Sequence, residues 1–236
     1  MSAVISKFTT KVILALDYSN KNQALELINN LDPAIYRLKI GKKMFSLFGK
    51  SLVVQIKNLG FDIFLDLKFH DIPNTVFGAV SAAADLGVWM ISIHISGGSK
   101  MLQAAKLALN PFKKDTPLLI GITVLTSFTE QDLREVGINS SITNQVLMLS
   151  RLAKQNGLDG VVCPGEESMN IKEKLGFGFK IVAPAIRLIE DPAYDQKKVI
   201  TPKLAKKFNI DYIIVGRTVT FSKNPLNKLK KITSFL

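Results

Sequence analysis

The feature that most constrains the fold of this chain is a regular alternation of short β-rich runs with longer helical stretches. The apolar runs cover residues 12–16, 35–40, 63–67, 90–95, 118–124, 160–163, 180–183 and 212–215. The helical stretches cover residues 22–30, 44–59, 74–86, 99–109, 144–156, 166–175, 201–208 and 226–232. Each run contains β-branched or aromatic residues, and most of the helical stretches begin with a polar residue. The pattern is typical of eight consecutive βα units.

Eight βα units close most simply into a (β/α)₈ TIM barrel, the α/β fold that we expect. Near-continuous apolar strands indicate a parallel sheet that is buried on both faces. The alternative is an open doubly wound sheet, which normally carries a glycine-rich turn after an early strand. The first turn reads DYSN at residues 17–20 instead, and the glycine pair at 97–98 is a weak signal. Because no linker divides the chain, we expect residues 1–236 to form one domain.

Composition excludes several other classes of protein. With 47% hydrophobic and 21% charged residues, the chain has enough apolar surface to bury a core. The lone Cys163 excludes an internal disulfide and indicates a reducing compartment, so we expect a cytoplasmic protein. No apolar run approaches the ~18 residues that would span a membrane, and the first ten residues do not read as a signal peptide.

The formal net charge of +12 is prominent but unspecific. Such a surplus suits a nucleic-acid partner, an anionic membrane surface, a phosphorylated substrate, or a solvated basic surface. The lysines are spread in short groups along helix faces and loops, with no basic tail and no nucleic-acid-binding motif. We therefore expect neither a nucleic-acid nor a membrane partner.

Polar or small residues end most of the predicted strands. In a barrel of this kind, the carboxyl ends of the strands build the active site. The residues at these ends are Asp17, Lys39, Asp66, Lys68, His94, Thr126, Ser127, Cys163, Pro164, Pro184, Arg187, Gly216 and Arg217. Asp66 and Lys68 are two residues apart, so they project to the same face of their strand, which we expect to be the barrel interior.

A charged pair that points into a barrel is costly unless each charge meets a partner or a ligand. One interpretation of Asp66 and Lys68 is a buried ion pair that plugs the barrel. The other is a catalytic pair, which is favoured by the crowding of Asp71, Asn74 and Thr75 in the loop that follows. A lysine beside carboxylates stays protonated, so Lys68 is a candidate general acid rather than a Schiff-base nucleophile.

The end of the eighth run predicts a phosphate site. Gly216 allows backbone N–H groups to approach an anion, and Arg217 offers a planar fork of donors. Barrel enzymes frequently bind phosphate after strands seven and eight. The long segment 185–200, which contains Arg187, Tyr194 and Gln196, is typical of a lid over such a site.

The segment 64–76, with the sequence FLDLKFHDIPNTV, resembles the signature of the orotidine 5′-phosphate decarboxylase family. The likeness continues in order through LALD at 14–17, RLKIG at 37–41, HISGG at 94–98, VLTS at 124–127, PAIR at 184–187, DQ at 195–196 and VGR at 215–217. It therefore runs through nearly the whole chain and falls on the strand ends.

The resemblance implies decarboxylation at C6 of the pyrimidine of orotidine 5′-phosphate, forming UMP without metal or cofactor. The family places a network of Lys39, Asp66, Lys68 and Asp71 at the centre of the site, with Lys68 as the proton donor to C6. Asp66 would lie against the substrate carboxylate, acting by ground-state stress or by preorganised electrostatics.

The resemblance also implies the substrate contacts and a homodimer. The implied substrate-binding set is Asp17, Lys39, Asp66, Asp71, Thr75, Thr126, Ser127, Pro184, Arg187, Gln196, Gly216 and Arg217. Asp17 and Lys39 match ligands of the ribose hydroxyls, whereas Thr126 and Ser127 match the base-binding strand end. Gln196, Gly216 and Arg217 match the phosphate grip, and Arg187 matches the closing loop. Asp71 and Thr75 match residues that reach into the neighbouring subunit's site.

Two departures from the family pattern lie outside this set: Thr218, where many relatives have proline, and Lys43, where an acidic residue is common. Thr218 is expected to loosen the phosphate loop, and Lys43 to alter the charge around the site. We interpret His70 and His94 as structural, because two histidines without a third ligand make a weak metal site. Cys163 is expected to be a small buried hydrophobe.

Two other functions compete with decarboxylation of orotidine 5′-phosphate. A related phosphate-binding barrel could act on sugar phosphates with a divalent metal and a similar Asp-x-Lys strand. The continuation IPNT at 72–75 argues against it. A nucleic-acid-binding module would show oligonucleotide binding that falls steeply with salt, and no turnover.

Overall fold

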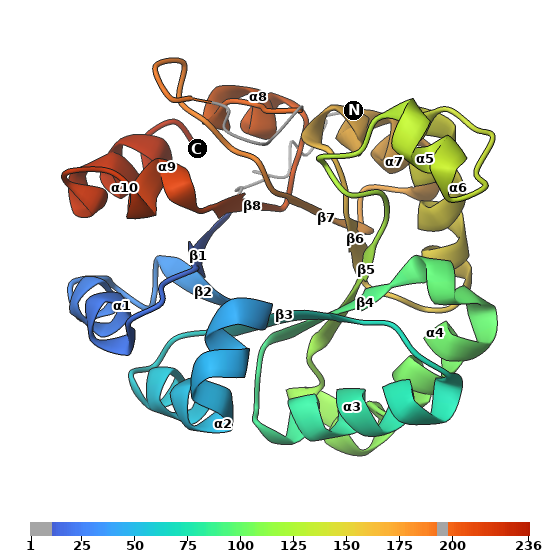
Figure 1. Ribbon diagram of the computed structural model, residues 1–236, viewed down its shortest axis with the longest axis horizontal. Helices are drawn as coiled ribbons and strands as arrows, with labels where there is room; N and C mark the ends of the chain where they lie inside the picture. The colour runs from blue at the N-terminus through green and yellow to red at the C-terminus, as the bar shows by residue number, and fades with distance from the viewer. Residues whose placement is uncertain (1–10, 193–197) are drawn as a thin grey trace, which may run out of the picture.

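A computed structural model describes residues 11–192 and 198–236. Within these residues, eight parallel strands close into a barrel in the order β1 to β8. Figure 1 views the ring of strands from one end, with the helices around its outside. The strands are β1 (Lys11–Leu16), β2 (Tyr36–Gly41), β3 (Ile63–Phe69), β4 (Met90–His94), β5 (Leu118–Ile122), β6 (Gly160–Val162), β7 (Lys180–Ala183) and β8 (Tyr212–Val215). The predicted (β/α)₈ barrel is confirmed.

One main helix follows each strand. These helices are α1 (Lys21–Ile28), α2 (Lys42–Asn58), α3 (Pro73–Asp85), α4 (Gly98–Leu107), α6 (Ile142–Gln155), α7 (Ser168–Leu175), α8 (Pro202–Lys207) and α10 (Pro225–Thr233). Side chains cap several of them: Ser141, Thr201 and Asn224 accept from backbone N–H groups in the first turn of α6, α8 and α10. None of the described helices has the length and apolar character needed to cross a membrane.

The structure contains short elements that the alternation did not predict. They are the helices α5 (Glu130–Glu135) and α9 (Arg217–Thr220) and the 3₁₀ turns η1 (Ile95–Gly97), η2 (Asn110–Asp115) and η3 (Gly165–Glu167). A capping box between Thr129 and Asp132 begins α5. The expected fifth strand ends at Ile122 rather than at residue 124, because its last partner, Val162, is the end of β6.

The strands divide the core into two layers. Alternate residues such as Leu14, Leu38 and Leu65 face the helices in one large apolar cluster. The opposite face fills the barrel with a smaller cluster, composed of Ile13, Ala15, Phe64, Met90, Ile120, Val182 and Ile214. Since side chains alternate along a strand, residues two positions beyond Phe64 and Met90 also point into the barrel. The next interior side chains of β3 and β4 are therefore Asp66 and Ser92.

Candidate active site

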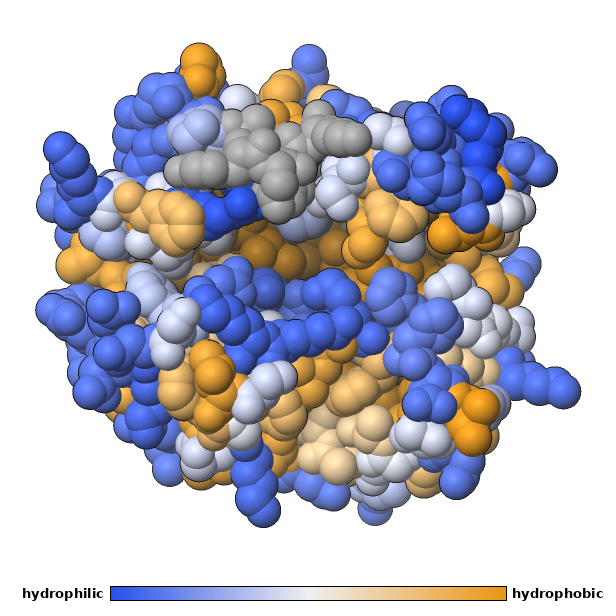
Figure 2. Space-filling view, in the orientation of Figure 1, coloured by the Kyte–Doolittle hydropathy of each residue, from blue (hydrophilic) through white to orange (hydrophobic). Residues whose placement is uncertain are grey.

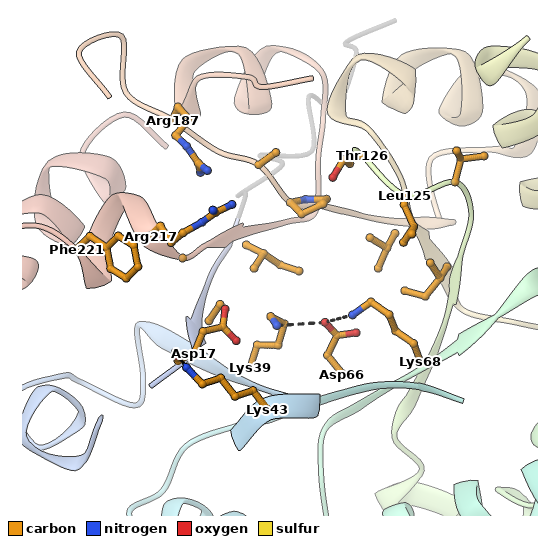
Figure 3. Close-up of a pocket in the computed structure, with 18 residues that line it drawn as sticks. Asp17, Lys39, Lys43, Asp66, Lys68, Leu125, Thr126, Arg187, Arg217 and Phe221 are labelled. Carbon is orange, nitrogen blue, oxygen red and sulfur yellow. Dashed lines mark hydrogen bonds and ion pairs between the residues drawn. The ribbon is translucent and has the colours of Figure 1, made fainter. Parts of the chain in front are cut away.

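A cavity of about 520 Å³ opens at the carboxyl ends of the strands, within the range of small-molecule sites. Its floor is apolar, formed by Ala15, Ile122, Val162 and Ile214 from four different strands. Figure 2 shows the same face hollowed near its centre, with hydrophobic residues in the depth and hydrophilic residues along one side. Charged side chains line this cavity, and Figure 3 shows them projecting inward from two opposite sides.

One side of the cavity holds a carboxylate between two ammonium groups. Asp66 Oδ2 lies 2.7 Å from Lys68 Nζ and 3.2 Å from Lys39 Nζ, as the dashed lines in Figure 3 mark. Burial alone would raise the pKa of Asp66, but the two lysines and the hydrogen bonds from Lys68 and Ser92 outweigh it, so the pKa lies below its usual value. Asp66 is therefore held as a buried anion, and both lysines present cationic groups to the cavity.

An irregularity in β3 directs Lys68 into this cluster. The register between β3 and β4 shifts between Leu65 and Phe69, and Lys68 has a left-handed backbone with φ of 53°. This conformation is strained for a residue with a side chain. The Lys68 N–H donates to Ser92 Oγ at 3.0 Å, and the Ser92 hydroxyl donates to Asp66 Oδ1 at 2.8 Å. Ser92, which is fully buried, thus holds both the strained backbone and the carboxylate.

The opposite side of the cavity is also cationic. Arg217, at the start of α9, and Arg187, in the segment after β7, both line the cavity and point toward it in Figure 3. Arg187 is 6% exposed, and its Nε donates to Pro192 O at 3.0 Å. Gly216 lies beside Arg217 at the end of β8. Two guanidinium groups at one end suit a ligand that carries a phosphate.

Comparison with known proteins assigns this arrangement to a family. A family model described as "Orotidine 5'-phosphate decarboxylase / HUMPS family" matches residues 10–232. The chain belongs to this family. The sequence resemblance is therefore confirmed over nearly the whole length of the barrel.

Relatives within the orotidine 5′-phosphate decarboxylase / HUMPS family cover almost all of the chain. An "Orotidine 5'-phosphate decarboxylase" of Buchnera aphidicola subsp. Acyrthosiphon pisum (strain 5A) is 56% identical over 94% of both chains. One of Salmonella paratyphi A is 50% identical over 95% of this chain and 92% of the relative. A crystal structure of orotidine 5′-phosphate decarboxylase from Lactobacillus acidophilus superposes with a TM-score of 0.84 at 36% identity, covering 96% of this chain and 98% of the other.

The structure brings together most of the site residues that the sequence predicted. Nine of them line the cavity, namely Asp17, Lys39, Asp66, Lys68, Thr126, Pro184, Arg187, Gly216 and Arg217. Ser127 is exposed and lies outside the lining set, although it follows Thr126 directly. Gln196 and Tyr194 fall in residues 193–197, outside the described part of the chain.

Asp71 and Thr75 are not among the residues that line the cavity of their own chain. Both are exposed, and Asp71 Oδ1 accepts from the N–H of Ile72 at 2.6 Å. Asp71 lines a separate hollow with His70, Ile72 and Ser96. Of the predicted four-residue network, three members are therefore in contact, and Asp71 does not contact them within one chain.

The histidines and the cysteine lie beside the site rather than in its lining. The rings of His70 and His94 are 5.3 Å apart between centroids. Burial, together with repulsion from His70 and nearby lysines, lowers the pKa of His94 to about 4. Burial also raises the pKa of the Cys163 thiol. Among the described residues, no three His, Cys, Asp or Glu side chains gather as a metal-binding group.

Ser92, Gly41 and Phe221 are among the residues near the cavity that were not predicted as part of the site. Ser92 could have been found, because it is the polar residue that shares the interior face of β4 with Met90. Gly41 permits a close approach: a Cβ there would meet Lys39 Nζ at 3.2 Å and Asp17 Oδ1 at 3.5 Å. Phe221 lines the cavity at its arginine side. Lys43, predicted only as a departure, also lines it, with Nζ 3.4 Å from Asp17 O.

Proposed function

We propose that this protein decarboxylates orotidine 5′-phosphate to UMP and CO₂, the last step of pyrimidine nucleotide synthesis, without metal or cofactor. The observation that carries the proposal is the Asp66 carboxylate held between Lys39 and Lys68 across a cavity from two arginines. Relatives at 50–56% identity that bear the name of this decarboxylase support the reaction. The proposal takes residues 1–236 as one catalytic domain in the cytoplasm.

The reacting end is the lysine side of the cavity. The pyrimidine C6 carboxylate lies beside Asp66, and Lys68 points its ammonium group at C6. As the bond between C6 and the carboxylate breaks, the electron pair stays on C6 and CO₂ leaves. The Lys68 ammonium stabilises the developing carbanion, then transfers a proton to C6 and regains one from water. Lys39 keeps Asp66 ionised and orients it, and together with Asp17 it binds the ribose hydroxyls.

The anchoring end is the arginine side of the cavity. Gly216, Arg217 and Gln196 hold the phosphate, and Arg187 approaches it from the segment after β7. Thr126, Ser127 and Pro184 contact the base between the two ends. Binding energy from the phosphate, which takes no part in bond breaking, positions C6 against Lys68.

The protein acts as a homodimer in which Asp71 and Thr75 complete the partner's site. Both residues are exposed: Thr75 lies in the first turn of α3, and Asp71 lies just before this helix, where it lines the hollow with His70 and Ser96. Two apolar side chains near them in the sequence are also exposed, since Ile72 is 67% exposed and Phe77 is 42% exposed. A second copy that covers this surface would bury these side chains and lend its own Asp71 to the site.

The first test measures the ultraviolet absorbance of orotidine 5′-phosphate with the protein in buffer containing EDTA. A decrease in absorbance, undiminished by the chelator, is expected. Pentulose and hexulose phosphates are assayed in parallel with and without a divalent metal. Activity on these sugars that EDTA abolishes, with none on orotidine 5′-phosphate, would show that the protein is a metal-dependent sugar-phosphate enzyme instead.

The second test addresses the shared site by mixing two inactive variants, Lys68→Ala and Asp71→Ala. If Asp71 serves the partner, a mixed dimer contains one site with neither substitution, so random exchange restores about a quarter of wild-type activity. The two variants carry different affinity tags, so that subunit exchange is measured directly. Exchange without recovery of activity would place Asp71 in its own chain's site.

A further inference from the structure

The carbonyl oxygen of Ile186 is a shared acceptor at the arginine side of the cavity. It accepts from Thr218 Oγ1 at 3.2 Å and from Arg187 Nη1 at 2.8 Å. A carbonyl oxygen has two lone pairs, so both bonds can form at once. This one peptide group therefore joins the hydroxyl of one segment to the guanidinium of another.

The two segments are those that supply the cavity with its arginines. Ile186 and Arg187 follow Ala185, which has a left-handed backbone with φ of 62°, and Arg187 N donates to Ile200 O at 3.0 Å. Thr218 directly follows Arg217 in the first turn of α9 and is 5% exposed. The bond from Thr218 to Ile186 is thus a buried link between the neighbours of Arg187 and Arg217.

Other contacts hold the outer part of the same segment. Lys228 of α10 lies 2.5 Å from Asp191 Oδ1, and Lys231 lies 2.7 Å from Glu190. Arg187 Nε also donates to Pro192 O. The two lysines fix Glu190 and Asp191 against α10, whereas the Thr218 hydroxyl fixes Ile186, at the inner end of the segment.

We propose that Thr218 is a positioning residue that sets Arg187 relative to Arg217, so that both guanidinium groups meet the phosphate of the bound nucleotide. This inference rests on the phosphate site proposed above. The Arg187 side chain is held by two backbone carbonyls, one of which Thr218 fixes from the other side. Such a preorganised fork loses little conformational entropy when it binds an anion. Thr218 therefore holds the phosphate loop at Arg217 against the segment that carries Arg187, whereas the sequence had led us to expect that it loosens this loop.

The decisive variant is Thr218→Val, which keeps the shape of the side chain and removes only the donor. Ile186 O still accepts from Arg187, so no buried polar group is left unpaired. Calorimetry with UMP and with uridine separates a phosphate effect from a general one. We expect Thr218→Val to weaken UMP roughly three- to tenfold, as for one hydrogen bond, and to leave uridine unchanged. The KM for orotidine 5′-phosphate should rise more than kcat falls.

Two further variants serve as controls. Thr218→Ser keeps the hydroxyl and should restore UMP affinity. Thr220→Val makes the same change two residues further along α9 and should leave both affinities unchanged. If Thr218→Val shows no cooperative unfolding transition in a thermal melt, the test is repeated with Thr218→Ala, which has a smaller side chain.

The outcomes also distinguish this inference from the phosphate site on which it rests, because Arg217→Ala is measured alongside. If Arg217→Ala weakens UMP but not uridine while Thr218→Val changes neither, the phosphate site stands and the positioning role is wrong. Equal weakening of UMP and uridine by Thr218→Val, or failure of serine to restore affinity, also overturns the role. If Arg217→Ala leaves UMP unchanged, the phosphate site itself is wrong and both proposals fall.

Discussion

The barrel has a buried lysine–aspartate cluster at each end, and the two clusters differ in what completes them. At the amino ends of the strands, Lys172 Nζ donates to Asp211 Oδ2 at 2.6 Å and to the carbonyls of Phe177 and Phe179, each at 3.0 Å. Asp211 Oδ2 also accepts from the N–H of Ile181 at 2.8 Å, and Lys180 lies 3.5 Å from Oδ1. Protein groups surround both charges of this cluster. Its contacts hold α7 and the start of β7 to Asp211, which lies directly before β8.

At the carboxyl ends, Asp66 is likewise held by two lysines, but these line an open cavity. Lys172 has no exposed surface, whereas the side chain of Lys68 is 27% exposed. The backbone of Lys68 is strained. A lysine–aspartate cluster therefore stabilises the fold where protein groups surround its charges. The same kind of cluster can act on a ligand where it lines a cavity.

The largest expected effect is a loss of activity on substitution of Lys68, in the cluster at the carboxyl ends of the strands. Lys68→Ala should lower kcat on orotidine 5′-phosphate by at least ~10⁴-fold, because the proposed proton donor is lost. Its urea unfolding midpoint should change little, since Lys39 still pairs with Asp66. Steady-state kinetics and urea denaturation on the same preparation provide the measurement, and near-wild-type kcat would remove Lys68 from the chemistry.

The reverse result is expected at the other end. Lys172→Met leaves Asp211 without its closest cation and removes the bonds that Lys172 donates to two carbonyls, which should lower the free energy of unfolding by about 3–5 kcal/mol. The folded fraction should keep its kcat, because this cluster lies at the opposite end of the barrel. A stable Lys172→Met protein with impaired kcat would contradict the division of roles.

Ser92→Ala tests whether the reactive cluster depends on its buried hydroxyl. Loss of the bonds to Asp66 Oδ1 and Lys68 N should lower kcat about tenfold. Removing the Ser92 donor raises the pKa of Asp66, so the acid limb of the kcat/KM profile should move to higher pH. Ser92→Thr keeps a hydroxyl and is the matched control. An unchanged pH profile in the alanine variant would limit Ser92 to packing.

The smallest expected effect is a loss of folding stability at low pH, caused by protonation of His94 at the carboxyl end of the barrel. The pKa of His94 is about 4 in the folded protein against an ordinary 6.5. The unfolded chain therefore takes up this proton first as the pH falls, and stability should decline between pH 6.5 and 4. Allowing for the partial exposure of His94, we expect a loss of about 1 kcal/mol. Urea titrations at several pH values should show a shallower decline in His94→Asn, and an equal decline would exclude His94 as the cause.

The barrel and the general location of the site could be predicted from sequence, because both depend on local periodicity. Asp66 and Lys68 were expected on one face of β3 and are confirmed there, although a bulge that the pattern did not show directs Lys68. Contacts between distant residues could not be predicted. Lys172 and Asp211 are 39 residues apart, and only the register of the strands brings them together. The helix α5, by contrast, had a local signal in its Thr129–Asp132 capping box.

The left-handed backbone of Lys68 has a consequence for the protein's evolution and engineering. Glycine adopts this conformation without strain, so Lys68→Gly should gain about 1 kcal/mol in backbone terms over Lys68→Ala. A choice made for stability alone would therefore favour glycine over alanine at a position where the proposed chemistry requires lysine. Backbone stability and the proposed proton transfer thus make opposite demands on this one position, so a screen for heat resistance that ignores activity should enrich glycine over alanine there.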